Sequence, residues 1–221
     1  MGAIIRLDAR HARAYVAEPE DRPRARVLVV HDAFGLLPHV RFLCDELAGN
    51  GFVALAPDLF EGTSTRSDAE ASRLLEQLSP SRAERLLTAA LAGFDTVGHP
   101  EGPNGIIGFS VGAEFAFGLA GNISMQGMVS YYGMPAEDQW QGLRTPLLAH
   151  WAEHDGWDDD ALPRQFVAEL SRRGVDVTSY VYPGTRHGFA NADIAVFDLD
   201  AAERAWRRTL EFLSRRLRGP L

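Results

Sequence analysis

Cysteine is almost absent from this chain, since Cys44 is the only one among 221 residues. A single thiol excludes a disulfide within the chain and a metal cluster held by thiolates. Together with Val40, Leu43 and Leu47, Cys44 belongs to a series of apolar residues spaced with the period of one helix face. We therefore predict a buried helix position for Cys44 rather than a reactive nucleophile.

A basic surplus and long apolar runs are also missing. The formal net charge is −8, which argues against nucleic acid and anionic membrane surfaces as partners. No apolar stretch reaches the length that spans a bilayer. The N-terminus shows no basic segment followed by an apolar run, so no secretory signal is evident. We therefore expect a cytoplasmic protein that makes no membrane contact and acts on small molecules.

The length and composition of the chain indicate one folded domain. With 46% hydrophobic and 24% charged residues, the chain is long enough to bury a full core. No internal repeat and no low-complexity segment divides the sequence. We therefore expect a single α/β domain over residues 1–221.

Strand-like and helix-like segments alternate along the chain. Apolar runs predict strands at 4–8, 12–17, 25–30, 52–56, 106–107, 127–132, 146–151 and 175–182. Amphipathic runs predict helices at 39–50, 67–77, 81–97, 113–121, 162–173 and 201–217. The first two strands form an antiparallel pair with a turn at 9–11. Otherwise the alternation predicts a mostly parallel sheet with helices on both faces, which binds ligands outside the carboxyl ends of its strands.

The two central helices each begin with a capping-box pattern, in which a serine bonds the amide three residues on and a glutamate bonds back. Ser67 with Glu70 starts the first helix, and Ser81 with Glu84 starts the second. Pro80 lies between them, so we expect the helical structure to be interrupted there.

The motif that carries chemistry is G-x-S-x-G, spelled by Gly108-Phe109-Ser110-Val111-Gly112. It lies between a predicted strand and a predicted helix, so Ser110 is expected on a sharp strand-to-helix turn. Glycine two residues to either side makes a strained backbone sterically possible. The turn lifts the hydroxyl above the sheet at the positive end of the helix, where acyl transfer can use a nucleophile. The alternative is a tight turn with a buried serine.

A neutral serine is a poor nucleophile and requires a base beside it, which a third group orients. On this architecture the acid and then the histidine follow later strands of the sheet. Asp155 comes shortly after the strand 146–151, and His187 follows the last strand. Both are predicted at the same edge of the sheet as Ser110, so Ser110, Asp155 and His187 are the candidate catalytic residues.

Both partners of Ser110 have alternatives nearby. Glu153 and Asp158 are rivals for the acid, and His154 is a rival for the base, although it directly neighbours Asp155. The other histidines are expected either in the strand core, as His150, or in solvated loops and helix starts, as His11, His39 and His99. Metal binding is the weaker interpretation of these side chains, so we expect no metal.

The tetrahedral intermediate of acyl transfer needs backbone N–H donors. One is expected from Val111, the residue after the nucleophile, and a second from the loop 31–36 after an earlier strand, with the amide of Ala33 as the candidate. Asp32 in that loop places an acid close to Ser110. Its role is open, because it either acts near the nucleophile or caps the loop or the next helix.

These segments resemble the dienelactone hydrolase family of α/β-hydrolases over nearly the whole chain. Order and approximate spacing agree at residues 29–35, 56–60, 108–112, 131–133, 154–155 and 182–190. The resemblance implies an α/β-hydrolase fold with little or no cap domain, and a cofactor-free hydrolase with a nucleophile–His–Asp triad. It also implies an acid, here Asp32, that reaches toward the nucleophile when no substrate is bound.

Two features depart from the family pattern. The family's typical nucleophile is cysteine, whereas this chain has Ser110, which generally requires His187 as its base. Members that cleave dienelactone also bind the substrate carboxylate with arginines. One of these positions is Asn191 here, and the other falls in a region that offers Arg66, Arg73 and Arg82.

The residues and the resemblance together predict a serine hydrolase that cleaves small carboxylic esters or lactones through an acyl-enzyme. The pocket is expected to be walled by Phe34, Phe60, Trp151 and Trp157. The alternative is a non-catalytic protein of the same fold that binds a small ligand or a partner. Haloalkane cleavage normally needs an aspartate in place of Ser110, and a peptidase more often carries a larger cap. Spare apolar surface on the last helix is compatible with a monomer or a homodimer.

Overall fold

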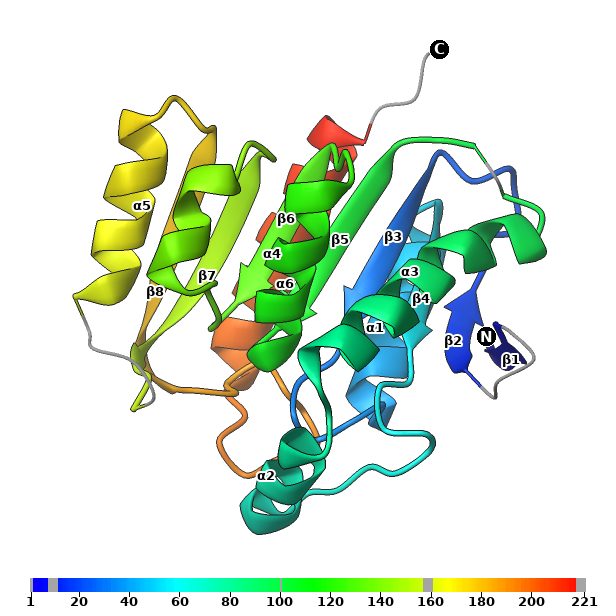
Figure 1. Ribbon diagram of the computed structural model, residues 1–221, viewed down its shortest axis with the longest axis horizontal. Coiled ribbons are helices and arrows are strands. Elements are labelled where there is room, and N and C mark those ends of the chain that lie inside the picture. The colour runs from blue at the N-terminus through cyan, green and yellow to red at the C-terminus, as the bar shows by residue number, and fades with distance from the viewer. Residues whose placement is uncertain (1, 8–11, 100, 157–160, 218–221) are drawn as a thin grey trace.

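An eight-stranded sheet forms the centre of the computed structural model, which describes residues 2–7, 12–99, 101–156 and 161–217 (Figure 1). The strand order is β1-β2-β4-β3-β5-β6-β7-β8. The bounds are β1 Ala3–Arg6, β2 Arg13–Ala17, β3 Ala25–Val30, β4 Phe52–Pro57, β5 Asn104–Phe109, β6 Gly127–Tyr131, β7 Leu147–His154 and β8 Val177–Arg186. The β1–β2 and β2–β4 pairs are antiparallel and the other pairs are parallel, which confirms the predicted mostly parallel sheet. The expected turn at 9–11 lies outside the described residues.

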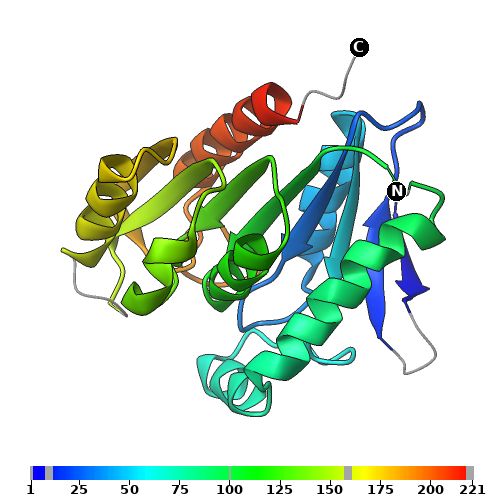
Figure 2. The same cartoon turned by 45° about the horizontal axis from the view of Figure 1, so that its top comes forward.

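Helices cover both faces of this sheet, as predicted (Figures 1 and 2). They are α1 Pro38–Gly49, α2 Asp68–Glu76, α3 Pro80–Thr96, α4 Val111–Asn122, α5 Leu162–Arg172 and α6 Leu199–Arg216, with a 3₁₀ helix η1 at Glu137–Gly142. Helices α1 and α6 pack on one face, whereas α3, α4 and α5 pack on the other. Helix α2 stands apart, beyond the carboxyl ends of the central strands, so the cap over that edge is small (Figure 1). No helix in the described part of the chain is long and apolar enough to cross a membrane.

The central strands are mostly apolar because both of their faces are covered. In β3, Val27 and Val29 pack with the α1–α6 layer, while Leu28 and Val30 pack with the α3–α4–α5 layer. Cys44 is completely buried in the α1–α6 layer, which confirms the predicted helix position. Burial raises the pKa of its thiol, so Cys44 is held as a neutral apolar side chain.

The helical structure is interrupted at residues 77–79, between α2 and α3, and Pro80 is the first residue of α3, where its missing N–H costs nothing. Both predicted capping boxes were wrong. The capping side chain is Ser79, whose hydroxyl accepts from the amide of Arg82, and not Ser81. At the start of α2, the Ser67 side chain makes no capping bond. The hydroxyl of Thr65 instead accepts from the Ser67 amide and donates to Glu70.

The last strand is longer than the sequence indicated. β8 continues past Tyr182 to Arg186, so that His187 directly follows the end of the strand. The extension pairs Arg186 with His154 across an irregularity in the β7–β8 ladder. This irregular pairing places the residues after both strands at one edge of the sheet.

The packing of α4 against β3 predicts opposite effects for two glycines of the same helix. A side chain at Gly112 would overlap the carbonyl groups of Val30 and His31, whereas one at Gly118 would enter open space. We expect Gly112→Ala to lower the free energy of unfolding by about 3 kcal/mol or more. Gly118→Ala should raise it by about 0.5–1 kcal/mol, because alanine favours the helix. Urea titration of both variants measures this, and equal effects would contradict the proposed packing.

Candidate active site

Ser110 occupies the strained turn between β5 and α4. Its backbone angles are φ 53° and ψ −125°, a left-handed conformation that is unusual for a side chain other than glycine. Its amide donates to the carbonyl of Tyr131 at 2.9 Å, which holds the turn against β6. A side chain at Gly108 would overlap the backbone of Ala113, and one at Gly112 would overlap β3, so the turn closes only because both are glycine.

The structure brings the three candidate catalytic residues into one hydrogen-bonded chain. Ser110 Oγ lies 2.7 Å from His187 Nε2, and His187 Nδ1 lies 2.9 Å from Asp155 Oδ1. A carboxylate only accepts hydrogen bonds, so a neutral His187 carries its proton on Nδ1 and offers Nε2 to the serine hydroxyl. Both partners of Ser110 are largely shielded, with 21% of the His187 side chain and 13% of the Asp155 side chain exposed. This arrangement can take a proton from Ser110 and stabilise the resulting imidazolium.

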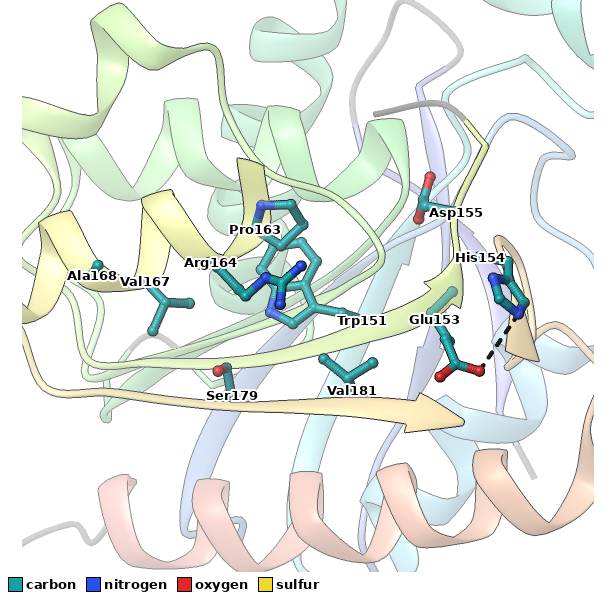
Figure 3. Close-up of a pocket in the computed structure, with 11 residues that line it drawn as sticks. Trp151, Glu153, His154, Asp155, Pro163, Arg164, Val167, Ala168, Ser179 and Val181 are labelled. Atoms are coloured by element: carbon teal, nitrogen blue, oxygen red, sulfur yellow. Dashed lines mark ion pairs between the residues drawn. The ribbon is translucent and has the colours of Figure 1, made fainter. Parts of the chain in front are cut away.

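The rival residues take other positions. Glu153 accepts from the amide of Gly184 at 2.7 Å and pairs with His154 at 3.5 Å, and both side chains are exposed (Figure 3). In this pairing His154 turns toward Glu153 and away from Asp155 (Figure 3). Asp158 lies outside the described residues.

The other histidines follow the predictions only in part. His150 is buried as expected, between Thr209 and Tyr182, and burial lowers its pKa to about 3. His39 was expected in solvent but is buried, and burial lowers its pKa to about 4. His11 lies outside the described residues. His150 and His154 are four residues apart, yet they lie on a strand, and no three potential metal ligands come together in the described part of the chain.

Asp32 lies in the same cavity as Ser110 but is held by other groups. Its Oδ1 accepts from the amide of Phe34 at 3.0 Å, and its Oδ2 accepts from Nδ2 of Asn191 at 2.8 Å. Burial raises the pKa of Asp32 to about 6. The two hydrogen bonds fix the loop that follows β3, so Asp32 caps this loop as one of the two sequence interpretations expected.

Asn191 is a functional candidate that the sequence did not indicate in this role. It is fully buried, and its Oδ1 accepts from the amide of Asp193 while its Nδ2 donates to Asp32. Asp193 in turn accepts from the amide of His39 and from Arg66. This series of hydrogen bonds connects the loop after His187 with Asp32 and with the segment before α2. No local pattern could reveal it, because Asp32 and Asn191 are 159 positions apart.

Two backbone amides near Ser110 are available for a ligand. Ala33 and Val111 both line the cavity, and neither amide donates to another of the described residues. Val111 is the first residue of α4, where an N–H has no acceptor within the helix. The amides proposed for the oxyanion are therefore both exposed to the cavity that contains the Ser110 hydroxyl.

The cavity around Ser110 has a volume of about 920 Å³. Its apolar wall comes from the loop after β3, helix α2 and the loop after His187, through Phe34, Ala71, Leu75, Ile194 and Val196. Of the aromatic residues expected to wall this pocket, Phe34 lines it, whereas Phe60 and Trp151 do not. Phe60 packs against the ring of His31 at 5.2 Å, and Trp157 lies outside the described residues.

Trp151 belongs to a different cavity, of about 510 Å³, between α5 and the strands β7 and β8 (Figure 3). Pro163 and Val167 of α5 face Trp151 and Val181 of the sheet there (Figure 3). Asp155 lies at the edge of both cavities, but Ser110 lines only the larger one. The larger cavity is therefore the one that can hold a substrate at the serine.

Tyr132 is a second cavity residue to which the sequence assigned no role. Its ring lies 5.0 Å from the ring of His187, and its backbone φ is 40°. The side chain is buried, which raises its pKa well above the ordinary value, and its hydroxyl bonds to no other described residue. Tyr132 therefore packs its ring against the ring of His187.

A serine at a strand-to-helix turn, with an acid and a histidine after later strands of a mostly parallel sheet, defines the chain as an α/β-hydrolase. The chain belongs to the dienelactone hydrolase family, whose sequence model matches residues 12–217. The predicted family and fold are thereby confirmed.

Relatives of similar length support this assignment. The protein usf of Aquifex pyrophilus is 26% identical, and the match covers 96% of this chain and 97% of the relative. A carboxymethylenebutenolidase homolog of Xenopus tropicalis is 29% identical over 92% of this chain and 87% of its own. A dienelactone hydrolase-like promiscuous phosphotriesterase from metagenomic libraries superposes with a TM-score of 0.84 at 21% identity, over 99% of both chains. That likeness shows the shared fold.

The raised pKa of Asp32 predicts how stability changes with pH. The unfolded chain loses this proton near the ordinary pKa of 3.8, whereas the folded chain keeps it up to about pH 6. Folding therefore loses stability as pH rises through this window, by about 3 kcal/mol in total at about 1.36 kcal/mol per pKa unit. Asp32→Asn removes this titration.

Urea titrations of wild type and Asp32→Asn at about pH 4 and about pH 7.5 measure the effect. The difference in unfolding free energy should shift by about 2 kcal/mol in favour of the variant at the higher pH, because the unfolded chain has already lost part of this proton at about pH 4. A constant offset due to the changed hydrogen bonds does not affect this comparison. A difference that is the same at both pH values would contradict the burial argument.

Proposed function

We propose that this member of the dienelactone hydrolase family cleaves small carboxylic esters or lactones with Ser110 as nucleophile. The observation that carries the proposal is the hydrogen-bonded chain from Ser110 through His187 to Asp155. The cavity of about 920 Å³ above Ser110 leaves room for a small ester. The reaction uses these side chains, two backbone amides and water.

In the first half of the reaction, His187 Nε2 accepts the proton of Ser110 as Oγ attacks the ester carbonyl. The carbonyl electrons move to the oxygen, which the amides of Ala33 and Val111 bind. Each well-placed donor contributes about 3 kcal/mol to the lowering of the barrier. Asp155 stabilises the imidazolium of His187. When the tetrahedral intermediate collapses, the alcohol leaves with the proton from His187, and Ser110 remains acylated.

In the second half, a water molecule gives its proton to His187 Nε2 and attacks the acyl carbonyl. Collapse of the second tetrahedral intermediate breaks the bond to Ser110, which recovers its proton from His187. The carboxylic acid is released and the free enzyme is restored. A lactone follows the same steps, except that its alcohol remains attached to the acyl group.

Asp32 takes a supporting part in this proposal. It is bonded to Phe34 and Asn191, while His187 lies 2.7 Å from Ser110, so His187 is the base. The bond from the Phe34 amide to Asp32 holds the loop that presents the amide of Ala33. Asp32 is therefore a positioning residue for one oxyanion donor.

Substitution of the three proposed residues should abolish ester hydrolysis. We expect Ser110→Ala and His187→Ala each to lower kcat/KM for p-nitrophenyl butyrate by at least about 10³-fold, and Asp155→Asn by about 10²-fold or more. Two matched controls are His154→Ala and Ser72→Ala, since both residues line the cavity but neither contacts Ser110. The controls should retain activity within about threefold. Equal rates in wild type and Ser110→Ala would contradict the mechanism.

A non-catalytic protein that binds a ligand is the alternative, and covalent labelling separates it from an enzyme. An activated serine attacks a fluorophosphonate, because the base beside it removes the hydroxyl proton. We expect wild type to be labelled at Ser110 to one equivalent, and His187→Ala to be labelled at least about 10²-fold more slowly. Intact-protein mass spectrometry measures the labelling. Absence of labelling in the folded wild type would favour the binding protein.

A further inference from the structure

The charged groups that line the cavity around Ser110 are mostly acidic. The carboxylates of Asp32, Asp68, Glu114 and Asp155 line it, whereas Arg186 is the only arginine among the described lining residues. The chain contains no lysine, so all 22 of its basic side chains are arginines. An arginine is therefore the only permanently charged side chain that can bind an anionic substrate group.

Asp32 lines the same cavity as Ser110, and both of its carboxylate oxygens accept hydrogen bonds from neutral groups. Asp32 is 2% exposed and is bonded to the neutral amide of Asn191 and to the backbone of Phe34. Burial raises its pKa to about 6, so it carries its charge at pH 8. The charge of Asp155, in contrast, is directed at His187. A second carboxylate brought next to Ser110 would therefore meet the charge of Asp32 in a partly desolvated site.

Two of the other candidate arginines are paired with carboxylates, and the third does not line the cavity. Arg66 is bonded to Asp193, and Arg82 is paired with Glu61. Arg73 lies in the last turn of α2 and does not line the cavity. Arg66, Arg73 and Arg82 were the candidates for the second arginine that binds a substrate carboxylate in the family. None of the three fills that position in the structure.

We propose that the preferred substrates carry an uncharged or cationic acyl group, and that esters with an anionic acyl group are disfavoured. The inference rests on the proposed ester hydrolysis at Ser110 and names its substrate class. The apolar wall formed by Phe34, Leu75, Ile194 and Val196 provides the surface for an alkyl or aryl acyl chain. Arg186 is the one arginine among the described lining residues and is exposed to solvent, so a terminal carboxylate meets mainly the repulsion of Asp32 and Asp68.

A matched series of three esters tests the charge preference. They are p-nitrophenyl hexanoate, mono-p-nitrophenyl adipate and p-nitrophenyl 6-(trimethylammonio)hexanoate, whose acyl chains differ at the far end. Each kcat/KM is divided by the rate constant of the same ester with hydroxide, which removes differences in intrinsic reactivity. In wild type at low salt, the normalised value for adipate should be at least about tenfold below that for hexanoate. The cationic ester should equal or exceed hexanoate.

Variants identify the charges that cause the discrimination. Asp32→Asn should reduce the hexanoate-to-adipate ratio at least about threefold, and Asp68→Asn should reduce it by a smaller factor. Asp68 is exposed at the start of α2, so Asp68→Asn should fold normally. This variant therefore tests the proposal even where Asp32→Asn is unstable. Glu76→Gln is the matched control, since Glu76 is also an exposed acid of α2 but does not line the cavity. Its ratio should equal that of wild type.

The outcomes separate this inference from the mechanism it rests on. If adipate and hexanoate have equal normalised values in wild type while Ser110→Ala is inactive, the substrate class is wrong and the mechanism stands. If Ser110→Ala hydrolyses hexanoate as fast as wild type, the proposed function itself is wrong. A wild-type preference that neither Asp32→Asn nor Asp68→Asn reduces would overturn the assignment to these carboxylates.

Discussion

The close approach of α4 to the carboxyl ends of β3 and β5 is the constraint on which the site depends. Gly112 lets the first turn of α4 touch the backbone of His31, and Gly108 lets β5 turn directly into the helix. Ser110 is thereby forced to a positive φ at the start of α4. Its hydroxyl makes no capping bond to the helix and is instead bonded to His187. Local packing thus separates the hydroxyl from the backbone groups that a serine in this position would otherwise bind.

The parallel order of the sheet then determines which residues can meet Ser110. β7 and β8 run parallel to β5, so the segments after them emerge at the same edge. His187 and Asp155 are the second and third members of the hydrogen-bonded chain because each follows the end of one of these strands. Tyr132 follows β6 and packs against His187, so three consecutive strands supply neighbouring parts of one site.

Much of this arrangement could be predicted because it depends on local patterns. The parallel sheet could be predicted from the apolar runs of β3 and β4, and the sharp turn from the glycines around Ser110. The catalytic acid and histidine could be predicted because each lies just after the end of a strand. The pairing of Asn191 with Asp32 could not be predicted, since it joins two loops far apart in the sequence. His39 was misplaced for the same reason, because the loop that carries Asp193 buries it. The start of α3 was predicted one residue late, after Pro80, because proline is compatible with both the end and the first turn of a helix.

The most direct measurement of the central claim is the identity of the acylated residue during turnover. Wild type is mixed with excess p-nitrophenyl hexanoate, quenched with acid in the steady state, digested and analysed by mass spectrometry. Our account predicts a hexanoyl group on Ser110, in the peptide that joins β5 to α4, and none in Ser110→Ala. A hexanoyl group on Cys44 or on another residue, together with undiminished hydrolysis in Ser110→Ala, would contradict the account.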